Sequence, residues 1–95
     1  MAGYLIAEIE VHDPALFEEY RKQVPATIAK YGGKYLVRGG ATDAIEGGWA
    51  PARLVVLEFP SMEQARKWYH SAEYKPLLAL RLKAAKSKAI LVDGV

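Results

Sequence analysis

The sequence contains no cysteine, and this absence excludes several kinds of chemistry. Neither a disulfide framework, nor a thiolate metal site, nor a cysteine nucleophile is available to the chain. Histidine occurs only at His12 and His70, and Glu10 shares a strand face with His12 at a metal-compatible spacing. No further histidine or cysteine completes a ligand set, so we expect no metal site and no cofactor.

Long apolar runs are also missing from the chain. None approaches the roughly 18 residues of a membrane span, and no basic segment precedes the first apolar residues. Charge of one sign is not in large excess, since 13 basic and 11 acidic residues are interspersed and give a net charge of +2. We therefore expect a cytoplasmic protein with neither a nucleic-acid partner nor a membrane partner.

The motifs of the common hydrolases are absent as well. The sequence has no Gly-x-Ser-x-Gly elbow, no His-Glu-x-x-His pair and no carboxylates spaced as in glycosidases. Its glycine pairs, at 39–40 and 47–48, fit no phosphate-binding pattern and are typical of turns. Standard hydrolytic chemistry therefore has no support in the sequence.

The composition is that of a small folded domain. Apolar residues make up 52% of the chain and charged residues 25%, which suffices for one core and one solvated surface. No repeat, linker or low-complexity stretch divides the chain, so residues 1–95 are predicted to form a single domain. A domain of this size buries only roughly 60 to 65% of its unfolded surface. We expect its stability to depend on packing or on a partner.

The secondary structure follows from alternating period-two and helical patterns. Asp13 and Ser61 are helix N-cap signals, and Ser71 can cap a further helix. We expect a kink or a break at Pro25, because proline removes a helical hydrogen bond. The predicted strands span residues 4–11, 34–38, 53–59 and 88–93, and the predicted helices span 14–31, 62–69 and 72–85.

This order of elements, βαββαβ, predicts an α+β fold with a ferredoxin-like antiparallel sheet and all helices on one face. The strand at 53–59 is apolar on both sides, with Leu57 and Phe59 on one and Leu54 and Val56 on the other. Water should not cover both faces, and no helix remains for the second. A second copy of the same sheet is the simplest cover, so we expect a two-fold homodimer.

Four segments carry a resemblance to a known family: YGGKYLVRGG at 31–40, EGGW at 46–49, RLVVLEFPS at 53–61 and WYHSAEY at 68–74. In order and spacing they resemble the domain-of-unknown-function family thirteen-thirty, over nearly the whole chain. The resemblance implies the dimeric α+β barrel superfamily, in which two ferredoxin-like subunits pack their sheets face to face. It implies no reaction, because the family has no established activity and the superfamily includes monooxygenases, haem-degrading enzymes, isomerases and dehydratases.

Arg81 is the most informative single residue, because helical spacing places it on the apolar face of the last helix, between Tyr74 and Ala85. A charge at such a position needs a partner. The partner is an internal carboxylate such as Glu46 or Glu58, or water reached by the extended side chain, or a carboxylate or enolate of a ligand. The sequence leaves these alternatives open.

Arg38 and Arg53 flank the loop that carries Glu46 and Trp49, so their side chains can meet at one rim of the sheet. They form either a clamp for an anionic ligand or ion pairs with Glu46 that fix the loop. Both alternatives place the two guanidinium groups at the same edge of the fold.

Aromatic and titratable side chains supply the remaining candidates. Trp68 and Tyr74 lie beside the break between the later helices, where their rings either wall a ligand pocket or pack in the core. His12 and Glu46 are the candidates for acid–base catalysis, and His12 would need a pocket at the end of its strand to act as a base. Each histidine can equally be a plain surface residue.

These residues favour a homodimeric domain that binds a small molecule and can act as a cofactor-independent enzyme on a small carboxylate or aromatic compound. The alternative is a non-catalytic structural or regulatory interaction module. The sequence decides neither between these two functions nor between substrates. The predicted binding residues are Arg38, Arg53, Trp68, Tyr74 and Arg81.

Overall fold

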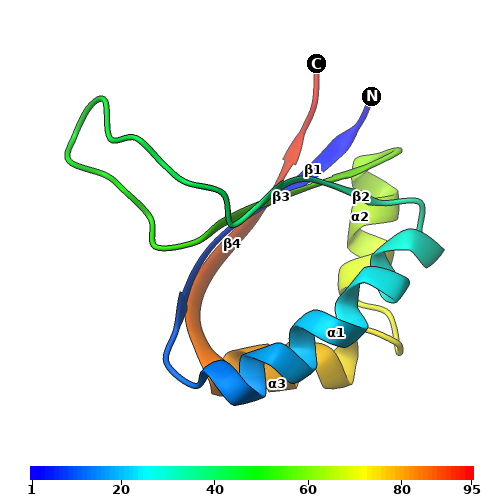
Figure 1. The fold of residues 1–95 in the computed structure, drawn as a ribbon. Coiled ribbons are helices and arrows are strands. Elements are labelled where there is room, and N and C mark those ends of the chain that lie inside the picture. Colours follow the sequence, from blue (N-terminus) through cyan, green and yellow to red (C-terminus); the bar gives the residue numbers. More distant parts are fainter.

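The computed structural model describes all of residues 1–95 and confirms the predicted ferredoxin-like α+β fold. Its elements are β1 (Gly3–Val11), α1 (Pro14–Lys30), β2 (Lys34–Arg38), β3 (Leu54–Phe59), α2 (Met62–Tyr69), α3 (Lys75–Ala84) and β4 (Ala85–Asp93). The strands form one antiparallel sheet in the order β2-β3-β1-β4. The sheet is curved, and all helices lie on its concave side (Figure 1).

The concave face is apolar because alternate strand residues are apolar. Leu5, Ala7 and Ile9 of β1 are buried there, and Leu57 and Phe59 of β3 are buried beside them. Burial contributes about 1.5–3 kcal/mol for each large side chain, so this face supplies much of the stability. The other buried apolar residues come from the helices and their flanks: Phe17, Tyr20, Val24, Ile28, Ala65, Trp68, Tyr74, Leu77, Ala84 and Ala85.

The ends of α1 follow from local sequence signals. Oδ1 of Asp13 accepts a hydrogen bond from the N–H of Leu16 at 3.1 Å, which confirms the predicted N-cap. At the other end, the N–H of Gly33 donates to the carbonyl of Ile28 at 2.9 Å. Gly32 has a φ of 78°, a left-handed conformation that favours glycine, so the helix ends there and the chain turns into β2.

Of the kink or break predicted at Pro25, the break is wrong, since α1 continues without interruption from Pro14 to Lys30. Tyr20 and Val24 before the proline and Ile28 after it are all buried. The core therefore holds both halves of the helix, and this burial outweighs the roughly 3 kcal/mol that an interior proline costs.

Two boundaries near the C-terminus also differ from the prediction. α3 begins later, at Lys75, because the hydroxyl of Ser71 accepts a hydrogen bond from the N–H of Tyr74 at 3.1 Å and stabilises a turn ahead of the helix. β4 begins earlier, at Ala85, because it pairs along the full length of β1. The helix and the strand therefore follow one another without a loop.

The convex face of the sheet is apolar near its centre, and no helix covers it (Figure 1). On it, Ile6 of β1 pairs with Val56 of β3 and with Ile90 of β4, and the side chain of Ile90 is 59% exposed. Leu54 of β3 and Val92 of β4 extend the same surface. The apolar second face predicted from the sequence is therefore present.

The loop between β2 and β3, residues 39–53, projects from the convex side of the sheet (Figure 1). Residues 40–50 are all exposed, including Ile45 at 87% and Trp49 at 60%. The indole N–H of Trp49 donates to Oε1 of Glu8 on the convex face, at 3.4 Å. The loop glycines with positive φ, as expected of turn residues, are Gly39, Gly47 and Gly48.

Candidate functional site

A cavity lies between the helices and the concave face of the sheet. Ala7 of β1 and Ala89 of β4 are paired in its floor, and their small side chains leave space that larger ones would fill. Its volume of about 40 Å³ holds roughly three water molecules. The lining residues are Leu5, Ala7, Ile9, Phe17, Tyr20, Ile28, Tyr35, Arg38, Arg53, Val55, Leu57, Trp68, Tyr74, Arg81 and Ala89.

Arg81 is the one charged residue that is buried, with 4% of its surface exposed. Its Nη1 donates to Oγ of Ser87 at 2.8 Å, while its buried Nε has no hydrogen-bond partner. None of the ion pairs in the structure includes Arg81. A buried guanidinium cation without a counter-charge and with a free N–H is unfavourable, and a bound anion would relieve both penalties.

The carboxylates expected as partners of Arg81 lie elsewhere, and these predictions are wrong. Glu58 is on the convex face, because alternation along β3 puts position 58 there. Nζ of Lys34 lies 3.2 Å from its carboxylate and the hydroxyl of Tyr4 donates to it at 3.0 Å, and these hydrogen bonds hold the pKa of Glu58 below its usual value. Glu46 is exposed in the loop at residues 39–53.

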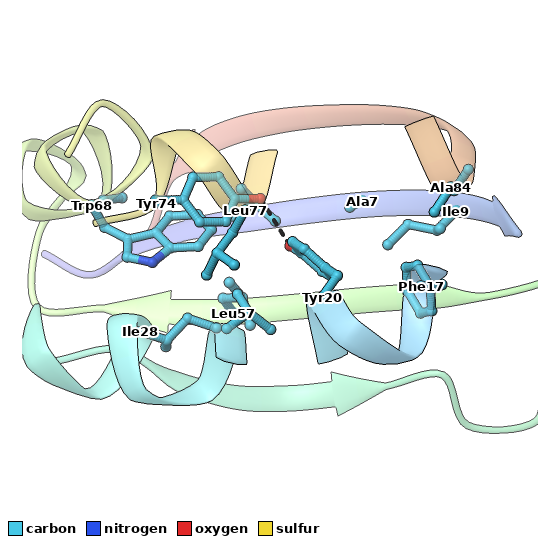
Figure 2. Packing of buried hydrophobic residues seen from close by; sticks show 14 of the residues in the cluster. Ala7, Ile9, Phe17, Tyr20, Ile28, Leu57, Trp68, Tyr74, Leu77 and Ala84 are labelled. Carbon is cyan, nitrogen blue, oxygen red and sulfur yellow. Dashed lines mark hydrogen bonds between the residues drawn. The ribbon is translucent and has the colours of Figure 1, made fainter. Parts of the chain in front are cut away.

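Two tyrosine hydroxyls face one another at the cavity. The oxygens of Tyr20, on α1, and Tyr74 lie 2.8 Å apart and share one hydrogen bond (Figure 2). Only one hydroxyl donates in that bond, so the other keeps a hydrogen for a further acceptor. Burial raises the pKa of both hydroxyls, and the nearby cation of Arg81 partly offsets the rise at Tyr74. Both are therefore neutral donors at physiological pH.

Arg38 lines the cavity because β2 contains a β-bulge. In a regular strand Tyr35 and Arg38 would point to opposite faces, since side chains alternate. The register shifts between Tyr35 and Val37, so Tyr35 pairs with Leu57 and Arg38 pairs with Val55. Both partners belong to the concave face and line the cavity. The bulge thus turns Arg38 inward, and its Cζ lies 4.5 Å from the centroid of the Tyr35 ring.

Arg53 stands at the same end of the sheet, immediately before β3, and its Cζ lies 5.3 Å from the centroid of the Phe17 ring. The predicted ion pairs of Arg38 or Arg53 with Glu46 are absent, because the loop carries Glu46 to the convex side. Gly39 passes close to Arg53: a Cβ there would stand 3.0 Å from Cζ of Arg53, and the φ of Gly39 is +70°. Only glycine allows this approach.

Trp68 and Tyr74 pack in the core, as one of the two alternatives predicted, and they also line the cavity. Their ring centroids lie 4.1 Å apart (Figure 2). Nε1 of Trp68 donates to Oγ1 of Thr27 on α1 at 3.0 Å, and its ring packs against Phe59 with centroids 5.4 Å apart. Contacts on several sides make this wall of the cavity rigid.

The structure does not bring the two acid–base candidates to the cavity. His12 is exposed in the turn between β1 and α1, and Glu46 is exposed in the loop on the convex side. Neither lines the cavity, and no other histidine or carboxylate does. The cavity therefore holds cations and neutral hydroxyls, which can stabilise an anion, but no side chain of the usual general-base type.

Two other kinds of site are not found. No group of three or more His, Cys, Asp or Glu side chains converges in a way that could hold a metal ion. No helix in the structure has the length and apolar character needed to cross a membrane.

Two polar residues that line the cavity, and Ser87, which accepts a hydrogen bond from Arg81, were not singled out from the sequence. Tyr20 occupies an apolar position of a predicted helix, and Tyr35 lies in a predicted strand. Spacing alone does not distinguish a tyrosine hydroxyl that faces a cavity from one that faces water. Ser87 lies in the part of β4 that was predicted to precede the strand. Its signal would have been its pairing with Ile9, which places it on the concave face.

Solved structures with similar folds were compared with this chain. RPA0582, a protein of unknown function from Rhodopseudomonas palustris, has a TM-score of 0.78 at 14% identity, covering 99% of this chain and 82% of that one. SnoaB, a cofactor-independent oxygenase from Streptomyces nogalater, has a TM-score of 0.66 at 14% identity, covering 99% and 93%. A dimeric ferredoxin-like protein of unknown function from Jannaschia sp. CCS1 has a TM-score of 0.73 at 7% identity, covering 99% and 100%.

At such identities the likeness concerns the fold alone. A search of curated proteins found no match to this sequence. A family model, in contrast, matches almost every residue and confirms the resemblance seen in the sequence segments. With residues 2–95 matched, the chain belongs to the family described as Domain of unknown function (DUF1330).

Proposed function

We propose that this chain is a single-domain homodimer that binds a small organic carboxylate, or the enolate of such a compound, in the cavity beside Arg81. The observation that carries the proposal is the buried guanidinium of Arg81, which has a free Nε and no carboxylate partner. The spare hydroxyl hydrogen of the Tyr20–Tyr74 pair adds a second donor in the same cavity. Together these donors fit an anionic oxygen group.

Catalysis at this site would be of a restricted kind. The guanidinium of Arg81 and the neutral tyrosine hydroxyls can stabilise negative charge that develops on a bound oxygen. No histidine or carboxylate lines the cavity to remove a proton, so the substrate would need an acidic proton or a reactive centre of its own. Cofactor-independent oxygenation, the activity for which SnoaB is named, is one reaction class of this kind.

The homodimer part of the proposal rests on the convex face. Ile6, Val56 and Ile90 form an apolar surface across β3, β1 and β4, and no helix of the chain covers it. A sheet face of this kind is covered in other folds by a second sheet packed about 10 Å away. Two similar structures are described as dimeric ferredoxin-like proteins, which supports the same arrangement here.

The non-catalytic interaction module remains the second candidate, and the size of the cavity favours it. A volume of about 40 Å³ is far below the roughly 300–1,000 Å³ of most ligand pockets. The exposed apolar residues Ile45 and Trp49 on the projecting loop offer a surface for a protein contact. The two candidates differ in whether any small compound stabilises the fold.

A thermal-shift comparison of small carboxylates with their neutral amides tests the proposal. Acetate, propionate and benzoate are measured against acetamide, propionamide and benzamide. We expect at least one acid to raise the melting temperature by roughly 10 °C or more near one hundred times its Kd, and its amide to have no effect. Equal shifts from acid and amide would contradict recognition of the negative charge, and no shift from any compound in a wider carboxylate screen would support the interaction module.

A further inference from the structure

The cavity contains more positive charge than one carboxylate can balance. Arg38, Arg53 and Arg81 all line it, and no acidic residue does. None of the three takes part in an ion pair anywhere in the structure. A ligand with one negative charge at Arg81 would leave the guanidinium groups of Arg38 and Arg53 with solvent as their only hydrogen-bond partner.

The three guanidinium groups lie at different depths. Arg81 is buried on α3, Arg53 is half-buried at the start of β3, and Arg38 is exposed at the end of β2. Arg38 and Arg53 belong to one rim, because the N–H of Gly39 donates to the carbonyl of Leu54 at 2.8 Å and joins the two strand ends. The site therefore has one positive group inside and two at its mouth.

Local backbone features place both rim arginines there. The bulge in β2 brings Arg38 to the concave face, from which a regular strand would have turned it away. Gly39, with its φ of +70°, leaves room for the side chain of Arg53. The aromatic rings of Tyr35 and Phe17 beneath the guanidinium groups attract the cations but leave their N–H groups without carboxylate acceptors.

The volume of the cavity limits how much of a ligand can lie beside Arg81. About 40 Å³ admits one carboxylate-sized group and little else beside Arg81. The rest of any ligand must then lie at the mouth, where Arg38 and Arg53 are within reach of solvent.

We propose that the ligand is a small organic dianion, with one carboxylate held by Arg81 and the Tyr20–Tyr74 hydroxyls and a second anionic group held at the mouth by Arg38 and Arg53. This assignment rests on the proposed function and makes it more specific. In this assignment Arg81 is required for any carboxylate to bind, and Arg38 and Arg53 give the preference for a ligand with a second negative charge.

Calorimetric titration at low ionic strength tests the assignment with dicarboxylates and their monomethyl esters. Malonate, succinate, glutarate and adipate scan the distance between the two charges. For the best chain length we expect the dicarboxylate to bind at least 10-fold more tightly than its monoester. Arg38→Gln and Arg53→Gln should each reduce this preference to about 3-fold or less, because the dicarboxylate loses more affinity than the monoester. Salt should weaken the dicarboxylate more than the monoester.

Arg66→Gln is the matched control, because Arg66 is an exposed arginine of α2 that neither lines the cavity nor forms an ion pair. It should retain the full preference. Equal affinities for diacid and monoester, or a preference that both rim variants retain, would overturn the dianion assignment while the carboxylate site stands. Binding of monocarboxylates but not of dicarboxylates would likewise overturn the dianion assignment and leave the carboxylate site standing. Failure of every carboxylate to bind would overturn the proposed function itself.

Discussion

The concave and convex faces of the sheet differ in what each leaves unsatisfied. On the concave face the core is packed, and what remains is a set of hydrogen-bond donors without acceptors, chiefly Nε of Arg81. On the convex face Glu58 is paired, and what remains near the centre is exposed apolar surface around Ile6 and Ile90. Donors require an anion, whereas apolar surface requires another apolar surface.

Because side chains alternate along a strand, neighbouring residues serve the two faces. Val56 and Leu57 of β3 show this, since Val56 pairs with Ile6 on the convex face and Leu57 with Leu5 on the concave face. The comparison predicts that neighbouring substitutions will affect different properties of the protein.

The largest expected effects come from this pair. Leu57→Ala should reduce the free energy of unfolding by about 2–5 kcal/mol through a cavity in the core and leave the dimer intact. Val56→Lys should convert the dimer to a monomer, because a buried charge without a partner is too unfavourable at a sheet-to-sheet interface. Sedimentation velocity and thermal unfolding separate the two outcomes. A wild-type monomer at micromolar concentration, or a dimer that survives Val56→Lys, would contradict the assignment of the convex face.

The smallest expected effect concerns a contact that belongs to neither face. The carboxylate of Glu73 accepts hydrogen bonds from Lys30 and Tyr31 at the end of α1, and the bond from Lys30 is the main reason that its pKa lies below the usual value. Because this pKa is lower in the folded state, the ionised carboxylate stabilises the fold at pH values above the unfolded-state pKa of about 4.3. The stabilisation is lost as the pH falls through the pKa of the folded state.

Glu73→Gln should therefore lower the melting temperature slightly at pH 7 and have no effect near pH 3. Glu63→Gln, at an exposed pair with Lys67 within α2, is the control and should have little effect at either pH. A larger loss for Glu73→Gln at pH 3 than at pH 7 would contradict this account of the carboxylate.

The fold could be predicted from the sequence because its signals are local. Period-two alternation predicted the strand β1, and Asp13 marked the start of α1. Pro25 misled the prediction, since tertiary packing of its neighbours outweighed a local signal. In each case the outcome depended on whether a residue acts through its neighbours in sequence or through contacts across the core.

The candidate site could be predicted only in part. Helical spacing placed Arg81 on a buried face, and the structure brings it to one cavity with Arg38 and Arg53. The bulge that turns Arg38 inward was not predictable, because Leu36 and Val37 are both apolar and alternation has no contrast there. The position of Glu46 depended on the direction in which a long loop leaves the sheet, and no local sequence pattern determines that direction. Glu58, in contrast, was assignable to the convex face by alternation with Leu57.

Replacement of Arg81 separates an internal structural role from a ligand-binding role. A control is needed for the hydrogen bond from Nη1 to Ser87, which any replacement of Arg81 removes. Ser87→Ala removes that bond alone, and a hydrogen bond to a charged group contributes about 1.5–3 kcal/mol. Any difference in melting temperature between the Arg81 variant and Ser87→Ala then reports the effect of the guanidinium charge itself.

The melting temperature of Arg81→Met without ligand tests the central claim most directly. If Arg81 is held for an anionic ligand, the variant loses an unpaired buried cation and keeps its packing, so its melting temperature should equal or exceed that of Ser87→Ala, and no carboxylate should raise it further. If Arg81 is instead a structural residue, its loss should lower the melting temperature well below that of Ser87→Ala, because the contacts of the guanidinium within the core are lost. Such a fall, or a carboxylate shift as large as that of the wild type, would contradict the account.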